Sequence, residues 1–191
     1  MSFTYVIFDC DKCDFHGNST ITWGDYKYVN EGKETNVNRD LGWCFECNKL
    51  VPIEDFSDSD RVIDLIELTT KELEAKANNK FSISFSKRDD KVYLIKEILE
   101  YSQRLKFIRE RIGSEKCLMC GSMEIKPFDG DYSFEPKEYM KRPFNSTKNT
   151  GFIHPGCGGG IIAKYNPVRI NLESLSRYYS IDGKPLNSEA D

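Results

Sequence analysis

The chain has 191 residues, of which 39% are hydrophobic and 30% charged, and its formal net charge is −4. This composition is typical of a globular protein and excludes general disorder, and no apolar run approaches the ~20 residues that cross a membrane. No segment has the strong positive charge of a dedicated nucleic-acid binder. The N-terminus lacks the basic and apolar regions of a signal peptide, so we expect a cytoplasmic protein with reduced cysteines and no membrane partner.

The first third of the chain is predicted to be β-rich. Aromatic and β-branched runs predict strands at residues 3–8 and 50–53. Residues 19–29 predict a hairpin that turns at Gly24-Asp25, because a Gly-X pair suits a two-residue turn. The polar residues 30–40 predict a loop.

The middle of the chain changes to helical periodicity from residue 57. The first predicted helix carries a largely apolar stripe in steps of three and four residues: Ile63, Ile66, Thr70, Leu73 and Ala77. A second helix is predicted from about residue 89, with its own stripe: Leu94, Ile98, Tyr101, Leu105, Ile108 and Ile112. Residues 81–85 read as a connector, and Gly113 is a natural stop. Two successive striped helices predict an antiparallel helical hairpin.

The last third returns to β structure. Strands are expected at residues 123–128, 161–163 and 168–172. Near the C-terminus, residues 178–186 predict another hairpin, which turns at Asp182-Gly183.

All seven cysteines and one of the two histidines fall into four pairs, each with two residues between its members. The pairs are Cys10 with Cys13, Cys44 with Cys47, Cys117 with Cys120, and His154 with Cys157. This spacing lets one tight turn direct two ligand atoms at a single ion, and four such ligands complete a tetrahedral site. We therefore predict two Zn²⁺ sites. Three thiolates with one imidazole suit zinc, whereas an all-cysteine site could also hold iron.

The simplest pairing joins the two nearest pairs in each half of the chain. It predicts a four-cysteine site from the first two pairs and a three-cysteine, one-histidine site from the last two. Pairing across the halves would instead produce one interleaved domain. Either way both sites are closed by four protein ligands, which favours structural over catalytic metals. The residues after each pair tolerate a left-handed backbone, as such turns often require: Asp14, Asn48, Gly121 and Gly158.

These paired ligands, each followed by a turn-tolerant residue and flanked by predicted strands, resemble the zinc-ribbon class. The resemblance covers about residues 1–55 and 114–172 and implies structural metal sites, not one activity. Ribbons of this class occur in transcription factors, ribosomal proteins, nucleases and adaptor subunits. The expected fold class is α+β, with an N-terminal ribbon domain at 1–56, a helical hairpin at 57–113 and a C-terminal ribbon domain at 114–191.

Other residues allow alternative interpretations. His16 lies three residues after Cys13 and could replace a cysteine as a ligand, although a surface histidine is the simpler interpretation. His154 and Cys157 also fit a base and a nucleophile, but no third group that would orient them is evident. The glycine-rich run 156–160 lacks the Gly-Lys-Ser/Thr ending of a phosphate loop.

No catalytic constellation is evident, so the leading hypothesis is a non-enzymatic protein-interaction or adaptor module with a protein partner. The first alternative is a nucleic-acid-binding protein that uses the second ribbon and a basic, aromatic helix face. That face would comprise Tyr101, Arg104, Lys106, Phe107, Arg109 and Arg111. The second alternative is an enzyme, or an enzyme accessory, whose active residues carry no recognisable pattern.

Overall fold

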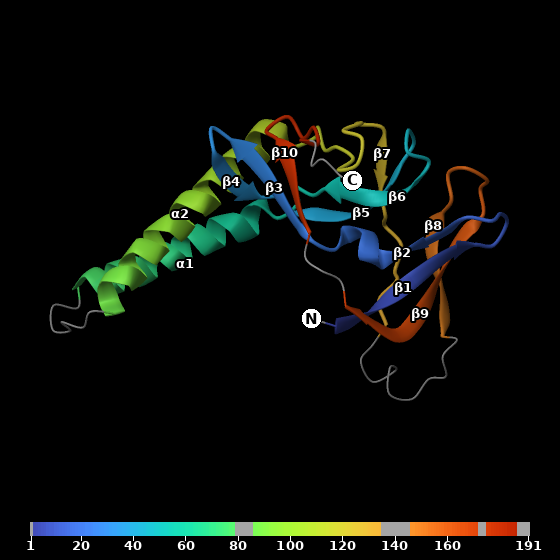
Figure 1. Ribbon diagram of the computed structural model, residues 1–191, viewed down its shortest axis with the longest axis horizontal. Coiled ribbons are helices and arrows are strands. Elements are labelled where there is room, and N and C mark those ends of the chain that lie inside the picture. Colours follow the sequence, from blue (N-terminus) through green and yellow to red (C-terminus); the bar gives the residue numbers. More distant parts are fainter. Residues whose placement is uncertain (1, 79–85, 135–145, 172–174, 187–191) are drawn as a thin grey trace.

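The computed structural model describes residues 2–78, 86–134, 146–171 and 175–186 (Figure 1). In these segments ten strands form three sheets, and two α-helices form a hairpin, so the fold is mixed α/β. The predicted connector at residues 81–85 lies outside the described residues. Neither helix is, over its described residues, both long and apolar enough to span a membrane.

The elements follow one another in the order β1–β6, α1, α2, β7–β10. The first six strands are β1 (Ser2–Cys10), β2 (His16–Asn18), β3 (Asp25–Asn30), β4 (Lys33–Asn36), β5 (Arg39–Cys44) and β6 (Lys49–Glu54), with a 3₁₀ turn η1 (Ser19–Thr22) after β2. The helices are α1 (Ser59–Asn78) and α2 (Ser86–Arg111). The last strands are β7 (Ile125–Pro127), β8 (Thr147–Ile153), β9 (Gly160–Asn171) and β10 (Ser176–Ser180).

The largest sheet joins the two ends of the chain. Its strand order is β2-β1-β9-β8, and β1 pairs antiparallel with β9 from Ser2↔Asn171 to Cys10↔Ile161. The strand predicted at residues 3–8 is confirmed as β1, and the two short strands predicted at residues 161–172 form the single strand β9. One face of this sheet contributes Phe8 and Ile161 to the main apolar core.

A second sheet also combines segments from both predicted ribbons. Its order is β6-β5-β7, so β5 is central and pairs with β6 in a hairpin and with β7 from beyond the helices. Trp43 of β5, for example, is aligned with Leu50 of β6 and Lys126 of β7. The third sheet, ordered β10-β3-β4, likewise pairs β10 with β3, so the first and last segments of the chain are interleaved in all three sheets.

The hairpin predicted at residues 19–29 is wrong. Residues 19–22 instead form η1, whose first turn is capped by the Asn18 side chain. Gly24 has a φ of 112° and leaves room for the Leu175 carbonyl, which would lie 2.8 Å from a Cβ there. The actual hairpin is β3–β4, which turns at Glu31-Gly32, where both residues have positive φ. The expected loop at 30–40 thus contains β4 and the start of β5.

The predicted helical hairpin is confirmed and extends from one end of the β structure (Figure 1). Leu94 and Ile108 of α2 are buried as expected. On α1 the most buried side chains are Val62 and Thr69, one residue before the predicted stripe positions. Ile112 lies beyond the end of α2 and is 63% exposed, so it does not belong to the helix contact.

The base of the hairpin is fixed to the β structure by a buried ion pair. Arg111, the last residue of α2, donates from Nη1 to Glu54 Oε1 at 2.8 Å and from Nη2 to Oε2 at 2.6 Å. Glu54 ends β6 and also accepts from the Tyr28 hydroxyl of β3 at 2.5 Å. The third sheet, ordered β10-β3-β4, therefore contacts both the helices and β6 at this point.

Candidate metal centres

The eight predicted ligands form two clusters, each of which could hold a metal ion. The first cluster comprises Cys10, Cys13, His154 and Cys157, and the second comprises Cys44, Cys47, Cys117 and Cys120. The expected pairing within each half of the chain is therefore wrong, and the alternative pairing across the halves is the one that the structure contains. The physical cause is strand pairing, because β1 aligns with β9 and β5 aligns with β7.

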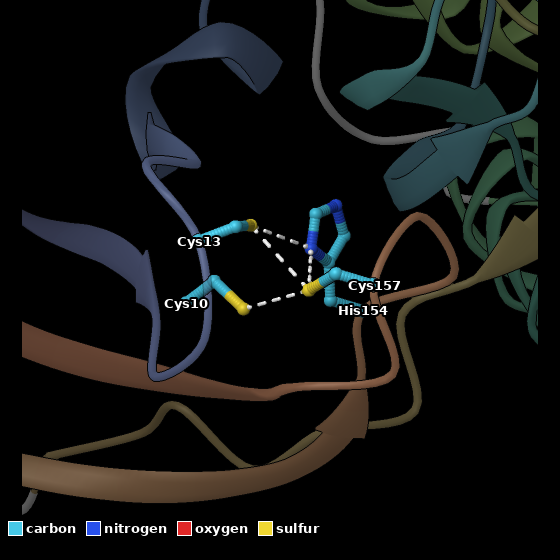
Figure 2. Close-up of side chains that lie close together, drawn as sticks. All are labelled: Cys10, Cys13, His154 and Cys157. Atoms are coloured by element: carbon cyan, nitrogen blue, oxygen red, sulfur yellow. Dashed lines mark hydrogen bonds between the residues drawn. The ribbon is translucent and has the colours of Figure 1, made fainter.

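The four ligand atoms of the first cluster lie within 4.8 Å of one another (Figure 2). The Cys157 sulfur lies 3.4 Å from the sulfurs of Cys10 and Cys13, and His154 Nδ1 lies 3.1 Å from Cys157 Sγ and 3.3 Å from Cys13 Sγ. An ion with metal–sulfur bonds of about 2.3 Å places its sulfurs about 3.8 Å apart and its nitrogen slightly closer. These four separations are slightly shorter than in a filled site, so the ligand atoms lie close enough together to share one ion.

Two antiparallel hairpin ends supply the first cluster. The Cys10 turn follows β1 and is closed by the Cys10 amide, which donates to the Phe15 carbonyl at 3.3 Å. The Lys12 amide donates to Cys10 Sγ at 3.4 Å. From the other hairpin, Gly159 approaches so closely that a Cβ there would lie 2.5 Å from Cys10 Sγ. Glycine at this position is therefore explained by the approach of the second turn, not by phosphate binding.

His154 is positioned by a buried aromatic environment. Its ring contacts Trp43 with centroids 4.6 Å apart and Phe15 with centroids 5.0 Å apart. Nδ1 faces the sulfurs. Burial lowers the pKa of His154 below its ordinary value of 6.5, so the neutral, metal-binding form is favoured at neutral pH.

The second cluster is built in the same way from β5–β6 and the turn before β7. Cys44 Sγ lies 3.6 Å from Cys120 Sγ, and Cys47 Sγ lies 3.8 Å from Cys117 Sγ. Backbone amides again face the sulfurs, since the Cys47 amide donates to Cys44 Sγ at 3.4 Å and the Met119 amide donates to Cys117 Sγ at 3.3 Å. Burial raises the pKa of the Cys117 thiol to about 11, so metal binding there must release a proton.

Three of the four turns use a left-handed residue after the second ligand, as expected. Asn48, Gly121 and Gly158 have φ values of 49°, 78° and 69°. The amides of Gly121 and Gly158 each donate to the carbonyl four residues earlier, at 2.9 Å in both turns. Asp14 has no positive φ, because the first turn is closed by the β1–β2 hairpin instead.

The donor sets fit structural zinc better than a catalytic metal. Four thiolates, or three thiolates and an imidazole, complete a tetrahedral shell and leave no position for a water or a substrate. Such a metal would join hairpin turns whose ligands lie at least 70 residues apart in each cluster. Its chemical contribution would be to hold the turns together, while the amides that face the sulfurs stabilise the thiolate charge.

The other sequence candidates do not join either cluster. His16 Nδ1 lies 2.8 Å from Asp9 Oδ1 on the neighbouring strand, and Asp9 also pairs with Lys164. In the basic helix face, Arg104 pairs with Asp58 and Arg111 with Glu54.

Sequence reasoning missed Trp43 as a support of the first cluster and Glu54 as the carboxylate that fixes α2. Trp43 had one usable signal, its position next to Cys44, but contact with His154 depends on the tertiary fold.

Comparisons with protein-family models, with curated proteins and with solved structures found no match.

Proposed function

We propose that this protein is a zinc-braced, non-enzymatic module that binds a protein partner through its helical hairpin. Two closed four-ligand clusters support a structural role for the metals. In the cytoplasm, where thiols stay reduced, zinc is the ion that best matches these thiolate and imidazole donors.

One observation carries the proposal: α2 exposes an apolar stripe that its own hairpin does not cover. Val92, Ile95 and Leu99 are 48%, 46% and 64% exposed. Their spacing of three and four residues places them on one helix face, which is the pattern by which a helix binds an apolar groove. Lys91 and Lys96 lie on either side of this face, so a partner groove with an acidic rim would complement it.

Capture from native extract tests the proposal when it is combined with matched variants. The full chain, loaded with zinc and tagged, is incubated with extract that has been treated with nuclease. Wild type and Val168→Glu, which alters an exposed apolar residue on β9, should retain a stoichiometric protein partner. The double variant Ile95→Glu/Leu99→Glu should lose it, while keeping its helix because glutamate is a good helix former.

Two results would contradict the proposal. One is equal capture by the stripe variant and wild type. The other is loss of every partner after nuclease treatment, together with micromolar or tighter nucleic-acid binding that weakens steeply with salt. The second result would establish the nucleic-acid alternative, for which Lys106 and Arg109 remain as exposed positive residues on α2.

A further inference from the structure

A cleft of about 560 Å³ lies where the end of α2 meets the sheet of β5, β6 and β7. Its volume is within the range of roughly 300–1,000 Å³ typical of ligand sites. The apolar part of its lining consists of Ile53, Phe56, Ile112, Met123, Ile125 and Pro127. Ile112 and Met123 are 63% and 56% exposed, so the cleft has apolar side chains available for contact.

The polar part of the lining is acidic. Asp40, Asp55 and Glu115 line the cleft, and no lysine or arginine of the described chain does so. These three carboxylates accept hydrogen bonds from backbone or amide groups, but none of them is in an ion pair among the described residues. Glu54 also lines the cleft, but Arg111 neutralises it. Among the residues that the structure describes, three carboxylates therefore line an apolar surface, and no lysine or arginine lines it with them.

We propose that this cleft binds a short basic segment of a protein partner, in which an apolar anchor residue is flanked by lysine or arginine. This inference rests on the proposed interaction function and adds the chemistry of one partner segment. The anchor would displace water from the exposed apolar lining, and the flanking cations would pair with the three carboxylates. The same charges repel phosphate, which makes the cleft unsuitable for nucleic acid or an anionic membrane surface.

The second metal cluster supports the walls of this cleft. Ile53 and Ile125 line the cleft and also pack with Cys44 and Cys117, two of the ligands. The loop from Cys117 to Ile125 carries both ligands of the turn before β7 and Met123. A metal in the second cluster would therefore hold β6, which carries Ile53, at a fixed distance from the loop that carries Met123.

Selection of peptides tests the proposal directly. A displayed library of short random peptides is panned on the zinc-loaded full chain, and the binding of enriched peptides is measured by fluorescence anisotropy. Enriched sequences should contain one large apolar residue with lysine or arginine on both sides. Their binding should perturb the NMR signals of Ile112, Met123 and Ile125, and should weaken as salt is added.

Charge-neutralising variants identify the site. Asp40→Asn/Glu115→Gln should weaken binding of the selected peptide at least ten-fold, whereas Asp129→Asn, which removes an exposed carboxylate outside the cleft, should leave it unchanged. If the double variant is poorly folded by circular dichroism, Met123→Gln provides the second test. It changes an exposed side chain, and it should also weaken binding at least ten-fold.

Several outcomes would overturn the inference. Enriched peptides without basic residues, no enrichment at all, or equal weakening by Asp129→Asn would each exclude the cleft as a basic-peptide site. Concentration-dependent self-association that the double variant abolishes would show that a second copy occupies the cleft. Because partner capture through α2 is measured with different variants, failure of the cleft inference can be distinguished from failure of the proposed function.

Discussion

The indole ring of Trp43 lies edge-on against the imidazole of His154, with ring centroids 4.6 Å apart and an interplanar angle of 68°. His154 is a ligand of the first cluster, and Trp43 directly precedes Cys44, a ligand of the second. Trp43 is almost completely buried in the main core. Trp43 therefore links the two candidate metal centres: its side chain packs against a ligand of the first, and its backbone continues directly into a ligand of the second.

Replacing Trp43 by alanine should weaken both metal sites at once. Removal of a buried tryptophan costs roughly 3–5 kcal/mol of folding free energy, since it leaves a cavity. Here that cavity would adjoin His154 and the strand that carries Cys44. Urea unfolding of the zinc-loaded protein would measure the loss, and a chromophoric chelator would measure faster metal release. Phe45→Ala, on the other side of Cys44 and 50% exposed, is the matched control and should cost much less.

Pairs of ligand substitutions should report which residues share an ion. Cys13→Ser/Cys157→Ser removes two ligands of one cluster, so the chain should retain one of its two zinc ions. Cys13→Ser/Cys47→Ser removes one ligand from each cluster and should leave both sites defective. Elemental analysis of protein purified without added zinc gives the stoichiometry.

The opposite result is equally informative. Retention of one zinc by Cys13→Ser/Cys47→Ser would mean that these residues share a site, as pairing within each half of the chain requires. Absence of zinc from the wild-type protein, together with free thiols, would show that neither cluster is a zinc site.

Metal affinity should fall as the pH falls, and more steeply at the second cluster. Ligand thiols must lose their protons before binding, and burial holds the pKa of Cys117 at about 11. The second cluster therefore displaces up to four protons near neutral pH. The first displaces up to three, because His154, with its pKa lowered below 6.5, is already neutral. Expected slopes are at most about four and about three decades of affinity per pH unit.

Single-site chains separate the two slopes. The Cys13→Ser/Cys157→Ser protein reports the second cluster, and Cys47→Ser/Cys120→Ser reports the first. Chelator competition at several pH values near neutrality gives each slope. Equal slopes would show that the two sites do not differ in the number of protons they release.

The four pairs of candidate ligands, which the structure gathers into two clusters, and the helices could be predicted because their signals are local. A spacing of two residues between ligands, or of three and four between apolar side chains, is fixed by one turn of backbone. The left-handed conformations of Asn48, Gly121 and Gly158 follow from the same short-range geometry.

The pairing of ligands could not be predicted in this way, since it depends on strands that are far apart in sequence. Cys10 lies next to Cys157 because β1 pairs with β9, and nothing in either turn records that alignment. The prediction of a hairpin at residues 19–29 was wrong for a related reason. Gly24 resembles a turn glycine, but its positive φ and missing side chain instead allow the Leu175 carbonyl, from the C-terminal part of the chain, to approach closely.

The ion pair between Glu54 and Arg111 should be essential to the attachment of the helical hairpin. The Glu54 side chain is 0% exposed and accepts from Arg111, from the Tyr28 hydroxyl and from the Lys116 amide. Arg111→Met would leave this carboxylate buried without a cation, which typically costs about 3–5 kcal/mol. Unfolding in urea, followed by circular dichroism, measures the effect on the zinc-loaded chain.

A double-mutant cycle separates the ion pair from the packing around it. In Glu54→Gln/Arg111→Met no buried charge remains, so the double variant should be more stable than Arg111→Met alone, even though it carries one more substitution. The exposed i,i+4 pair Lys106–Glu110 of the same helix is the control, because such a pair contributes only about 0.3–0.5 kcal/mol and its disruption should be nearly silent. If Arg111→Met were as mild as Lys106→Met, water would reach Glu54 when its partner is lost. The base of the hairpin would then be held by apolar contacts such as Phe56 with Val62 and Ile108, and not by the ion pair.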